Sequence, residues 1–513
     1  MKPEILNVIS RLSKYVLLAI AALYAVVYLV LVFFRIQYPF ELEWMEGGSL
    51  HQVTRILTGQ KLYVSPSMEF VPYIYTPLYF YASALMSKIV GSGFVPLRLV
   101  SFIASLGCFL IIFLIVKRET KSSFFAVLAS CLFSAAFKIS GAFFDIARVD
   151  SLFLFFLLAA LYLIKFKDSP KSFILAGVLV SLSFLTKQTA LLLAAPIMLY
   201  SVLANWRRSL FFIGTVCIIA TAGTLILDYI HNGWFSYFVF KLPARHSVNL
   251  RMFARFWFED LIRPLPIALV ASIFYIYVQF LKSNKKNLLF YSVITVGALG
   301  LSFLARLNTG GYPNALLPAY AVISILFGLA AHTAFQFALP KSDGKRNLEK
   351  ISVYLVCTVQ FFLLFYNPFK QVPTRNDLEA GKRLVSTIQQ VKGAVLAPCN
   401  AYLPVLAGKD WYADESAFAE LVGIFGGGQT EQGEKFMNEL RRAVKEKKFD
   451  VIIINAPGDT WLLQFRKDVE KYYALKRFVF DNKTVFWPVT GRRIRPEYLY
   501  VPKTYDINRR PAL

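Results

Sequence analysis

The stretch that decides the fold is YVLLAIAALYAVVYLVLVFF, residues 15–34, which runs without a single charged side chain. A transmembrane helix needs about 20 consecutive apolar residues, because that length crosses the hydrocarbon core of a bilayer. No small-residue cleavage site follows, only Phe33-Phe34-Arg35. The sequence therefore predicts an uncut membrane anchor and not a signal peptide.

The composition extends this interpretation to the whole chain. The 513 residues are 57% hydrophobic and 17% charged, whereas soluble domains are nearer about 25% charged. The net charge of +25 would suggest nucleic acid in a soluble protein, but in a membrane protein the positive-inside rule explains it, so we expect no nucleic-acid partner. The five cysteines and four histidines form no disulfide framework and no metal-ligand pattern, and we expect no metal site from them.

The placement of basic residues sets the expected topology. Arg11 and Lys14 precede the first span, which puts the N-terminus in the cytoplasm. We expect the segment 76–91 to lie along the outer surface, since KRETK (117–121) then falls inside. The expected fold is a polytopic helical membrane protein of the inner membrane with about eleven spans. The expected spans are 15–34, 97–116, 122–143, 151–164, 172–186, 188–204, 209–229, 264–281, 288–304, 315–337 and 351–366.

The hydropathy falls after Tyr366, and the chain divides there into two predicted domains. Residues 1–366 form the transmembrane domain, with outer loops at 35–96 and 230–263. Residues 367–513 form a small extracytoplasmic α/β domain. Within it, GAVLAPC (393–399) and DVIIINAPG (450–458) are typical of buried strands, and an amphipathic helix is expected between them.

The first outer loop carries ELEWMEGGSL, residues 41–50, with three carboxylates just past a membrane span. Glu43 and Glu46 are three positions apart and precede GSLHQVTRILTG (48–59), which has the spacing of an amphipathic helix lying on the membrane surface. These acids could take a proton from a hydroxyl. Alternatively, they only complement the positive end of the helix dipole. Glu41 is interpreted as an interface charge.

A second group of charges lies in FFDIARVDSLFLFFLLAALYL, residues 143–163. The apolar run after Asp150 is short, so a spanning helix would draw Arg148 and Asp150 into the outer part of the membrane. Ionisable residues at that depth predict a functional site. The alternative is a purely structural ion pair made by Arg148 with Asp150 or with Asp145.

Several cations on the outer side break the positive-inside rule. An anionic ligand would explain them, and so would lipid head groups. Asn314 lies beside two glycines on the same side, where the backbone can approach a ligand closely. The candidate cationic side chains are Lys187, Lys241, Arg245, His246, Arg255 and Arg306.

The motifs EWMEGGSLHQVTRILTGQKLY, YTPLYFYASALMSKIVG, PLRLVSFIASLG, ARVDSLFLFFLLAALYL and FLTKQTA, in this order, resemble the C-type superfamily of membrane glycosyltransferases. That superfamily includes protein O-mannosyltransferases, aminoarabinose lipid A transferases and arabinosyltransferases. The resemblance covers residues 35–205 well and 305–320 loosely. Its members commonly carry Asp-Glu in the first outer loop, where this chain has Met45-Glu46. The resemblance implies a polyprenyl-phosphate-linked sugar donor and transfer on the outer face of the membrane, in cell-envelope glycan biosynthesis.

The expected function is therefore inverting, base-assisted transfer of a hexose or pentose to a hydroxyl of a glycan, lipid or protein acceptor. Membrane lipids are also expected partners, since they would surround the protein. Glu46, which directly precedes the helix, is the favoured base, and Glu43 is the alternative. The six cations would hold the donor phosphate, and Arg148, Tyr75 and Asn314 would contact substrate. Asp145 and Asp150 would orient the acceptor; the alternative is a divalent cation. A lipid or sugar transporter is the competing class, but no internal repeat supports it.

Overall fold

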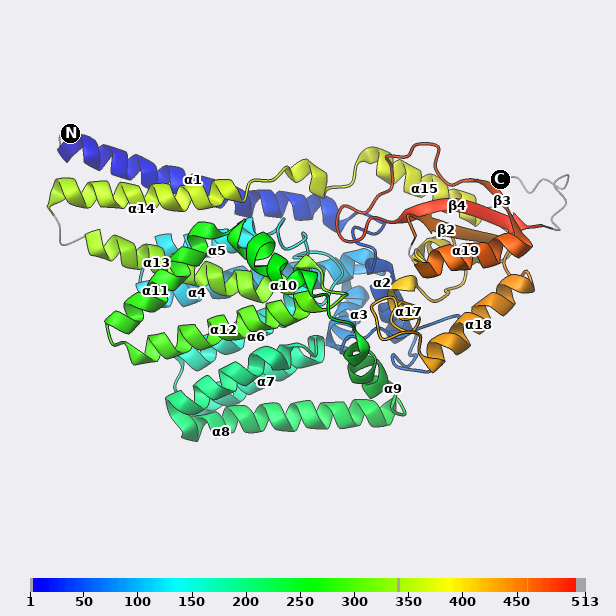
Figure 1. Ribbon diagram of the computed structural model, residues 1–513, viewed down its shortest axis with the longest axis horizontal. Helices are drawn as coiled ribbons and strands as arrows, with labels where there is room; N and C mark the ends of the chain where they lie inside the picture. Colours follow the sequence, from blue (N-terminus) through cyan, green and yellow to red (C-terminus); the bar gives the residue numbers. More distant parts are fainter. Residues whose placement is uncertain (1–2, 339–341, 459, 504–513) are drawn as a thin grey trace.

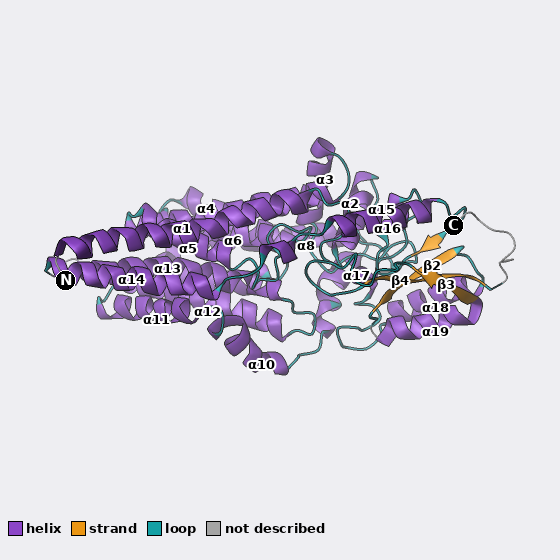
Figure 2. Cartoon of the chain, turned by 90° about the horizontal axis from the view of Figure 1, so that it is seen from above, coloured by secondary structure: helices purple, strands orange, loops and turns teal. Residues whose placement is uncertain are grey.

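The computed structural model describes residues 3–338, 342–458 and 460–503. Figure 1 shows an elongated molecule with a helical bundle at one end and a small sheet at the other. The N-terminus lies at the far end of the bundle, and Figure 2 shows the strands gathered at the opposite end. The fold is thus mostly helical.

The bundle consists of long, apolar helices that pack side by side. The segment that contains α13 lies at the centre of the bundle, since 94% of its most apolar stretch is buried inside the protein. α8 lies at the periphery, where only 11% of its most apolar stretch is buried. The helices are α1 (Pro3–Ile36), α4 (Phe94–Thr120), α5 (Ser123–Ala135), α6 (Asp150–Phe166), α7 (Pro170–Thr186), α8 (Ala190–Ile230), α11 (Pro266–Leu281), α12 (Lys285–Leu307), α13 (Leu317–Ala338) and α14 (Asp343–Leu363).

Each expected span has a helical counterpart, but the expected number of spans is not confirmed. Among the described residues, five helices are long and apolar enough to cross a membrane, or up to seven if each of two bent pairs counts as one span. α8 joins two expected spans across non-helical backbone at Asn205, and α5, α6 and α7 are short. The chain is an integral membrane protein with several apolar spans.

Short helices lie between the bundle and the sheet (Figure 1). The predicted amphipathic helix is present as α2, but residues 46–53 of it are buried between the two parts of the molecule and do not lie on a membrane surface. The predicted surface segment is α3, which ends at Gly91 as expected and leaves Leu85 and Ile89 exposed. The short elements of this part of the chain, of which α10 and η3 lie against the bundle helices, are α2 (Glu46–Leu57), α3 (Leu78–Val90), α9 (Trp234–Ser236), η1 (Tyr237–Lys241), η2 (Pro243–Arg245), α10 (Arg251–Arg255), η3 (Phe256–Ile262) and η4 (Pro313–Leu316).

The C-terminal part folds around a four-stranded sheet with the order β1-β2-β4-β3. β1 and β2 pair in parallel, and the other two pairings are antiparallel. The two strands and the helix expected from sequence appear as β1, β2 and α18, whereas β3 and β4 were not expected. Its elements are η5 (Pro368–Gln371), α15 (Arg375–Gln389), β1 (Val395–Leu396), α16 (Tyr402–Leu406), α17 (Glu415–Phe418), α18 (Glu431–Lys445), β2 (Val451–Ala456), α19 (Thr460–Tyr472), β3 (Tyr473–Phe478) and β4 (Arg495–Pro502).

The loop that carries the three glutamates joins the two parts. Glu41 accepts hydrogen bonds from the Gly47 amide at 2.9 Å and from Asn400 at 2.7 Å. Tyr73 and Ser416 share a hydrogen bond of 2.5 Å across the same boundary. A Cβ at Gly48 would lie 2.0 Å from the Tyr73 hydroxyl oxygen, so the close approach requires glycine there. Glu41 is therefore a buried structural residue, and its interpretation as an interface charge was wrong.

Candidate functional site

A cavity of about 140 Å³ lies where the bundle meets the outer loops and the C-terminal part. Seven separate segments of the chain line it, and four of the ionisable residues chosen from sequence meet there: Glu43, Arg148, Lys187 and His246. Its polar lining includes Glu43, Tyr75, Arg148, Lys187, His246, Asn314 and Glu420.

Glu43 places a carboxylate on the wall of this cavity. Its Oε2 accepts the Met45 amide hydrogen at 3.1 Å and lies 3.6 Å from Nη1 of Arg148. Burial raises the pKa of Glu43 to about 7, although the charge of Arg148 opposes the shift. A carboxylate with a pKa near neutrality can both hold a proton and release it at the operating pH, as a general base requires.

Arg148 stands at the centre of the charges. It donates a hydrogen bond to the Tyr75 hydroxyl at 2.8 Å, contacts the sulfur of Met45, and lies 4.0 Å from Asp150. Its side chain is only 5% exposed. Burial lowers its pKa, but Tyr75, Glu43 and Asp150 together raise it above the usual value, so the guanidinium stays charged.

Lys187 and Asp150 form the second charged pair of the cavity. The Lys187 ammonium lies 2.7 Å from Oδ1 of Asp150, and Asn314 donates a hydrogen bond to the same oxygen at 3.0 Å. Lys187 lines the cavity, while Asp150 is fully buried behind it. Asp150 therefore holds Lys187 in place and does not itself face the cavity.

His246 and Glu420 form the opposite wall. They are hydrogen-bonded to each other, and Phe425 packs beside the imidazole with ring centroids 5.6 Å apart. Burial lowers the pKa of His246, but the hydrogen bond and the charge of Glu420 raise it overall. The pair connects the loop 230–263 to the C-terminal part, since the Ser247 amide also donates to the Phe425 carbonyl at 3.0 Å.

Glu46 lies outside the cavity and is fully enclosed. Arg98 donates to both of its oxygens, at 2.9 and 2.6 Å, and the amides of Leu42 and Ala147 donate to them at 2.7 Å. Burial alone would raise the pKa of Glu46, but these donors lower it. Glu46, the base favoured from sequence, therefore has a lowered pKa and no open position that could take up a proton from a substrate.

The remaining predicted residues also lie away from the cavity. Asp145 pairs with Arg35 at 2.7 Å, and Arg306 pairs with Asp260 at 2.8 Å. Arg245 donates to the Gly427 carbonyl at 2.6 Å, and Arg255 forms a surface pair with Glu259 at 3.6 Å. Lys241 is exposed at the end of η1. None of these residues is part of the cavity lining.

Sequence reasoning missed the contribution of the C-terminal part. Glu420 and Phe425 lie in ELVGIFGGGQ, residues 420–429, a stretch that contains no recognisable motif. The run of glycines was a usable signal, because Gly423, Gly426, Gly427 and Gly428 all have positive φ and shape a tight loop. Within the described residues, no group of three or more His, Cys, Asp or Glu is placed to hold a metal ion.

Comparisons with known proteins agree with the motifs. Residues 74–227 match the family model of dolichyl-phosphate-mannose-protein mannosyltransferase. The chain is similar to ArnT from Cupriavidus metallidurans in the apo state, with a TM-score of 0.56, 12% identity and coverage of 93% of this chain and 97% of that chain. ArnT from the same organism bound to undecaprenyl phosphate matches with a TM-score of 0.54, 13% identity and the same coverage. A search of curated proteins gives no significant match.

These similarities confirm the predicted resemblance to the C-type membrane glycosyltransferases. At such low identity the two ArnT structures show a shared fold. The family match covers YTPLYFYASALMSKIVG, PLRLVSFIASLG, ARVDSLFLFFLLAALYL and FLTKQTA, which supply Tyr75, Arg148 and Lys187 of the cavity.

Proposed function

We propose that this protein is a membrane glycosyltransferase that moves a sugar from a polyprenyl-phosphate donor to an acceptor hydroxyl on the outer face of the membrane. One observation carries the proposal: a single cavity, in a chain with this fold, joins a carboxylate of near-neutral pKa to two paired cations. The carboxylate is Glu43, and the cations are Arg148 and Lys187.

The cations suit a phosphate leaving group. Lys187 offers a point charge held by Asp150, and Arg148 offers a planar guanidinium held by Tyr75. Such positioned cations stabilise the negative charge that develops on a departing phosphate and need not reorganise when it forms. The same chemistry fits the donor implied by the ArnT structure with undecaprenyl phosphate.

The carboxylate suits the acceptor. Glu43 would take the proton of the acceptor hydroxyl as its oxygen attacks the anomeric carbon from the face opposite the phosphate. The bond from the anomeric carbon to the phosphate oxygen breaks, and its electron pair leaves with the polyprenyl phosphate. This displacement inverts the anomeric configuration. The favoured base thus moves from Glu46 to Glu43, because Glu46 has no oxygen facing the cavity.

The proposed orientation follows from the charge at the opposite end of the bundle. There Lys14 lies over Phe124, Arg118 bonds the Phe166 carbonyl, and Lys165 bonds Asn287. This end contains the N-terminus (Figure 1) and would be cytoplasmic by the positive-inside rule. The cavity and residues 367–513 would then be extracytoplasmic.

The test is transfer by the purified protein. It would be reconstituted in proteoliposomes and incubated with a cell-envelope extract that supplies acceptor hydroxyls and with undecaprenyl-phosphate-linked pentoses and hexoses that are radiolabelled in the sugar. We expect release of undecaprenyl phosphate from at least one donor and a labelled product of inverted configuration. Movement of intact donor across the bilayer without bond cleavage would instead show a transporter and overturn the proposal.

A further inference from the structure

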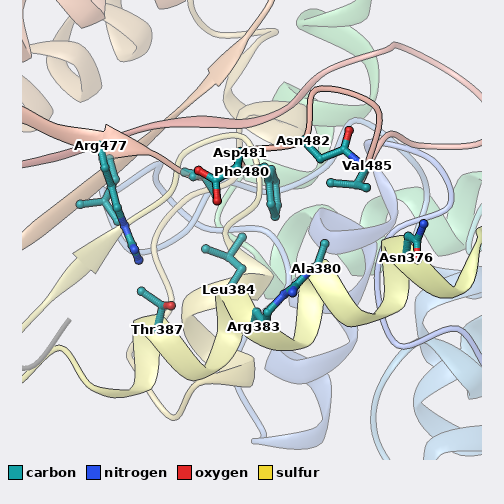
Figure 3. A pocket seen from close by; sticks show the side chains of 12 residues that line it. Asn376, Ala380, Arg383, Leu384, Thr387, Arg477, Phe480, Asp481, Asn482 and Val485 are labelled. Atoms are coloured by element: carbon teal, nitrogen blue, oxygen red, sulfur yellow. The ribbon is translucent and has the colours of Figure 1, made fainter.

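A second cavity, of about 350 Å³, lies within the C-terminal part (Figure 3). α15 forms one wall, and the end of β3 with the loop after it forms the other. Cavities of about 300–1,000 Å³ are the usual size of small-ligand sites. It shares no lining residue with the cavity that holds Glu43, so it is a separate site.

The floor of this cavity is apolar and its rim is polar. Leu384 and Phe480 are 5% and 9% exposed, and Leu499 is 1% exposed beneath them. Around them stand side chains that donate or accept hydrogen bonds: Asn376, Arg383, Thr387, Arg477, Asp481 and Asn482. An apolar surface ringed by such groups matches a sugar ring, which has apolar faces and a polar edge.

Two arginines give the cavity its charge. Arg383 stands on α15 and Arg477 extends from β3 toward Thr387 on that helix (Figure 3). Across the described ranges, neither guanidinium forms a hydrogen bond or an ion pair. By contrast, Arg375 on the same helix pairs with Glu379 at 2.9 Å. With Asp481 as the single carboxylate of the lining, the cavity carries a net positive charge.

We propose that this cavity binds an acidic saccharide unit of the acceptor, an inference that rests on the proposed function. Guanidinium groups pair with carboxylates and phosphates through two parallel hydrogen bonds, and Arg383 and Arg477 are free to do so. Asp481, Asn482 and Thr387 would bond sugar hydroxyls. A simple anion would make no use of the apolar floor, and an acyl chain would make no use of the arginines.

The cavity is joined to the loop that carries Glu43 by a row of aromatic rings. Phe480 contacts Phe486 with ring centroids 5.3 Å apart, and Phe486 contacts Phe40 at 5.2 Å. Phe40 lies three positions before Glu43. A Cβ at Gly381 would lie 2.3 Å from Phe40, so α15 also packs directly on this loop. An acceptor held here by its acidic unit would contribute remote binding energy to the reaction at Glu43.

The experiment measures saccharide binding to the purified full-length protein in detergent by titration calorimetry. The probes are trigalacturonic acid, the neutral trisaccharide maltotriose and inorganic phosphate. We expect the acidic trisaccharide to bind and maltotriose not to bind. Arg383→Gln and Arg477→Gln should each weaken binding about tenfold or more, as loss of a hydrogen bond to a charged group implies. Arg375→Gln, on the same helix but outside the cavity, should leave the affinity unchanged.

Each other result overturns the inference. Equal affinity for both trisaccharides, no binding of either, or equal losses in all three variants would remove the assigned role of the two arginines. Phosphate binding as tight as that of the acidic trisaccharide would leave an anion site without sugar recognition. These titrations contain no donor, so they test the cavity independently of sugar transfer. If trigalacturonic acid binds here but the transfer assay shows no turnover of any polyprenyl-phosphate sugar, the proposed function is refuted and the cavity stays assigned to an acidic saccharide.

Discussion

The short loop of residues 41–46 contributes a carboxylate to each of two buried clusters of charge, one around Glu46 and one around Glu43. The two carboxylates differ in their surroundings. At Glu46, two N–H groups of Arg98 and two backbone amides donate hydrogen bonds to the carboxylate, so both of its oxygens are occupied and the group is fully enclosed. At Glu43, one amide and a guanidinium at 3.6 Å leave the carboxylate on the wall of a cavity. The difference shows that a buried charge in a membrane protein indicates function only where its bonding capacity is left open.

The largest effect is expected from a substitution that disrupts the enclosed cluster around Glu46. Arg98→Met leaves Glu46 buried without its partner, and removing one member of a buried pair costs about 3–5 kcal/mol. We expect the free energy of unfolding in detergent to fall by that amount. The double variant Arg98→Met/Glu46→Gln should recover part of the loss, because no uncompensated charge remains. Equal losses in the single and double variants would contradict a structural ion pair.

The next effect concerns the open cluster. Glu43→Gln keeps the shape of the side chain but cannot take a proton, so transfer should fall by about 10²-fold or more. Donor affinity and thermal stability should stay near those of the unchanged protein. Glu259→Gln, in the exposed outer loop, is the matched control and should transfer normally. Normal transfer by Glu43→Gln, with a loss confined to a well-folded Glu46→Gln, would reverse the comparison.

The cations of the open cluster should act on donor binding. Lys187→Gln removes a charged partner of the phosphate and should weaken donor binding by about 1.5–3 kcal/mol. Arg255→Gln, the matched cation on the surface, should bind the donor normally. Unchanged donor affinity in Lys187→Gln would instead point to lipid head groups as the partners of the outer cations.

Asp150→Asn tests the support behind Lys187. The amide keeps a hydrogen bond but removes the charge that holds the ammonium in place. We expect a smaller loss of donor affinity than in Lys187→Gln, and little additional loss in the double variant, since both changes act through one contact. Fully additive losses in donor-binding measurements would assign Asp150 an independent role.

The smallest expected effect is a pH dependence. Because the pKa of Glu43 is raised to about 7, the ionised fraction grows as pH rises through that value. Transfer should increase roughly tenfold between pH 6 and pH 8, and the residual activity of Glu43→Gln should lack this rise. A rate that is flat over this range in the unchanged protein would separate Glu43 from the proton transfer.

Several residues of the candidate site around Glu43 could be predicted, because the type of a residue and its place along the chain are visible in the sequence. Charges beside long apolar runs are costly, so Glu43, Arg148, Asp150 and Lys187 stood out without a structure. Their assignment to roles was less accurate. Glu46 and Glu43 differ little along the chain, and only the position of Arg98, far away in sequence, decides which of them is sealed.

The sequence by itself determined that this chain is a helical membrane protein resembling C-type glycosyltransferases, since apolar length and ordered motifs are local properties. It also determined β1 and β2, whose apolar residues form continuous runs, and α18, whose apolar residues recur with helical spacing. Tertiary structure alone decided that Glu420 contributes to the first cavity and that Arg383 and Arg477 both line the second. The reason is physical: contacts between segments far apart in the sequence decide which polar groups meet and which keep unpaired hydrogen-bonding atoms, and no local pattern encodes such contacts.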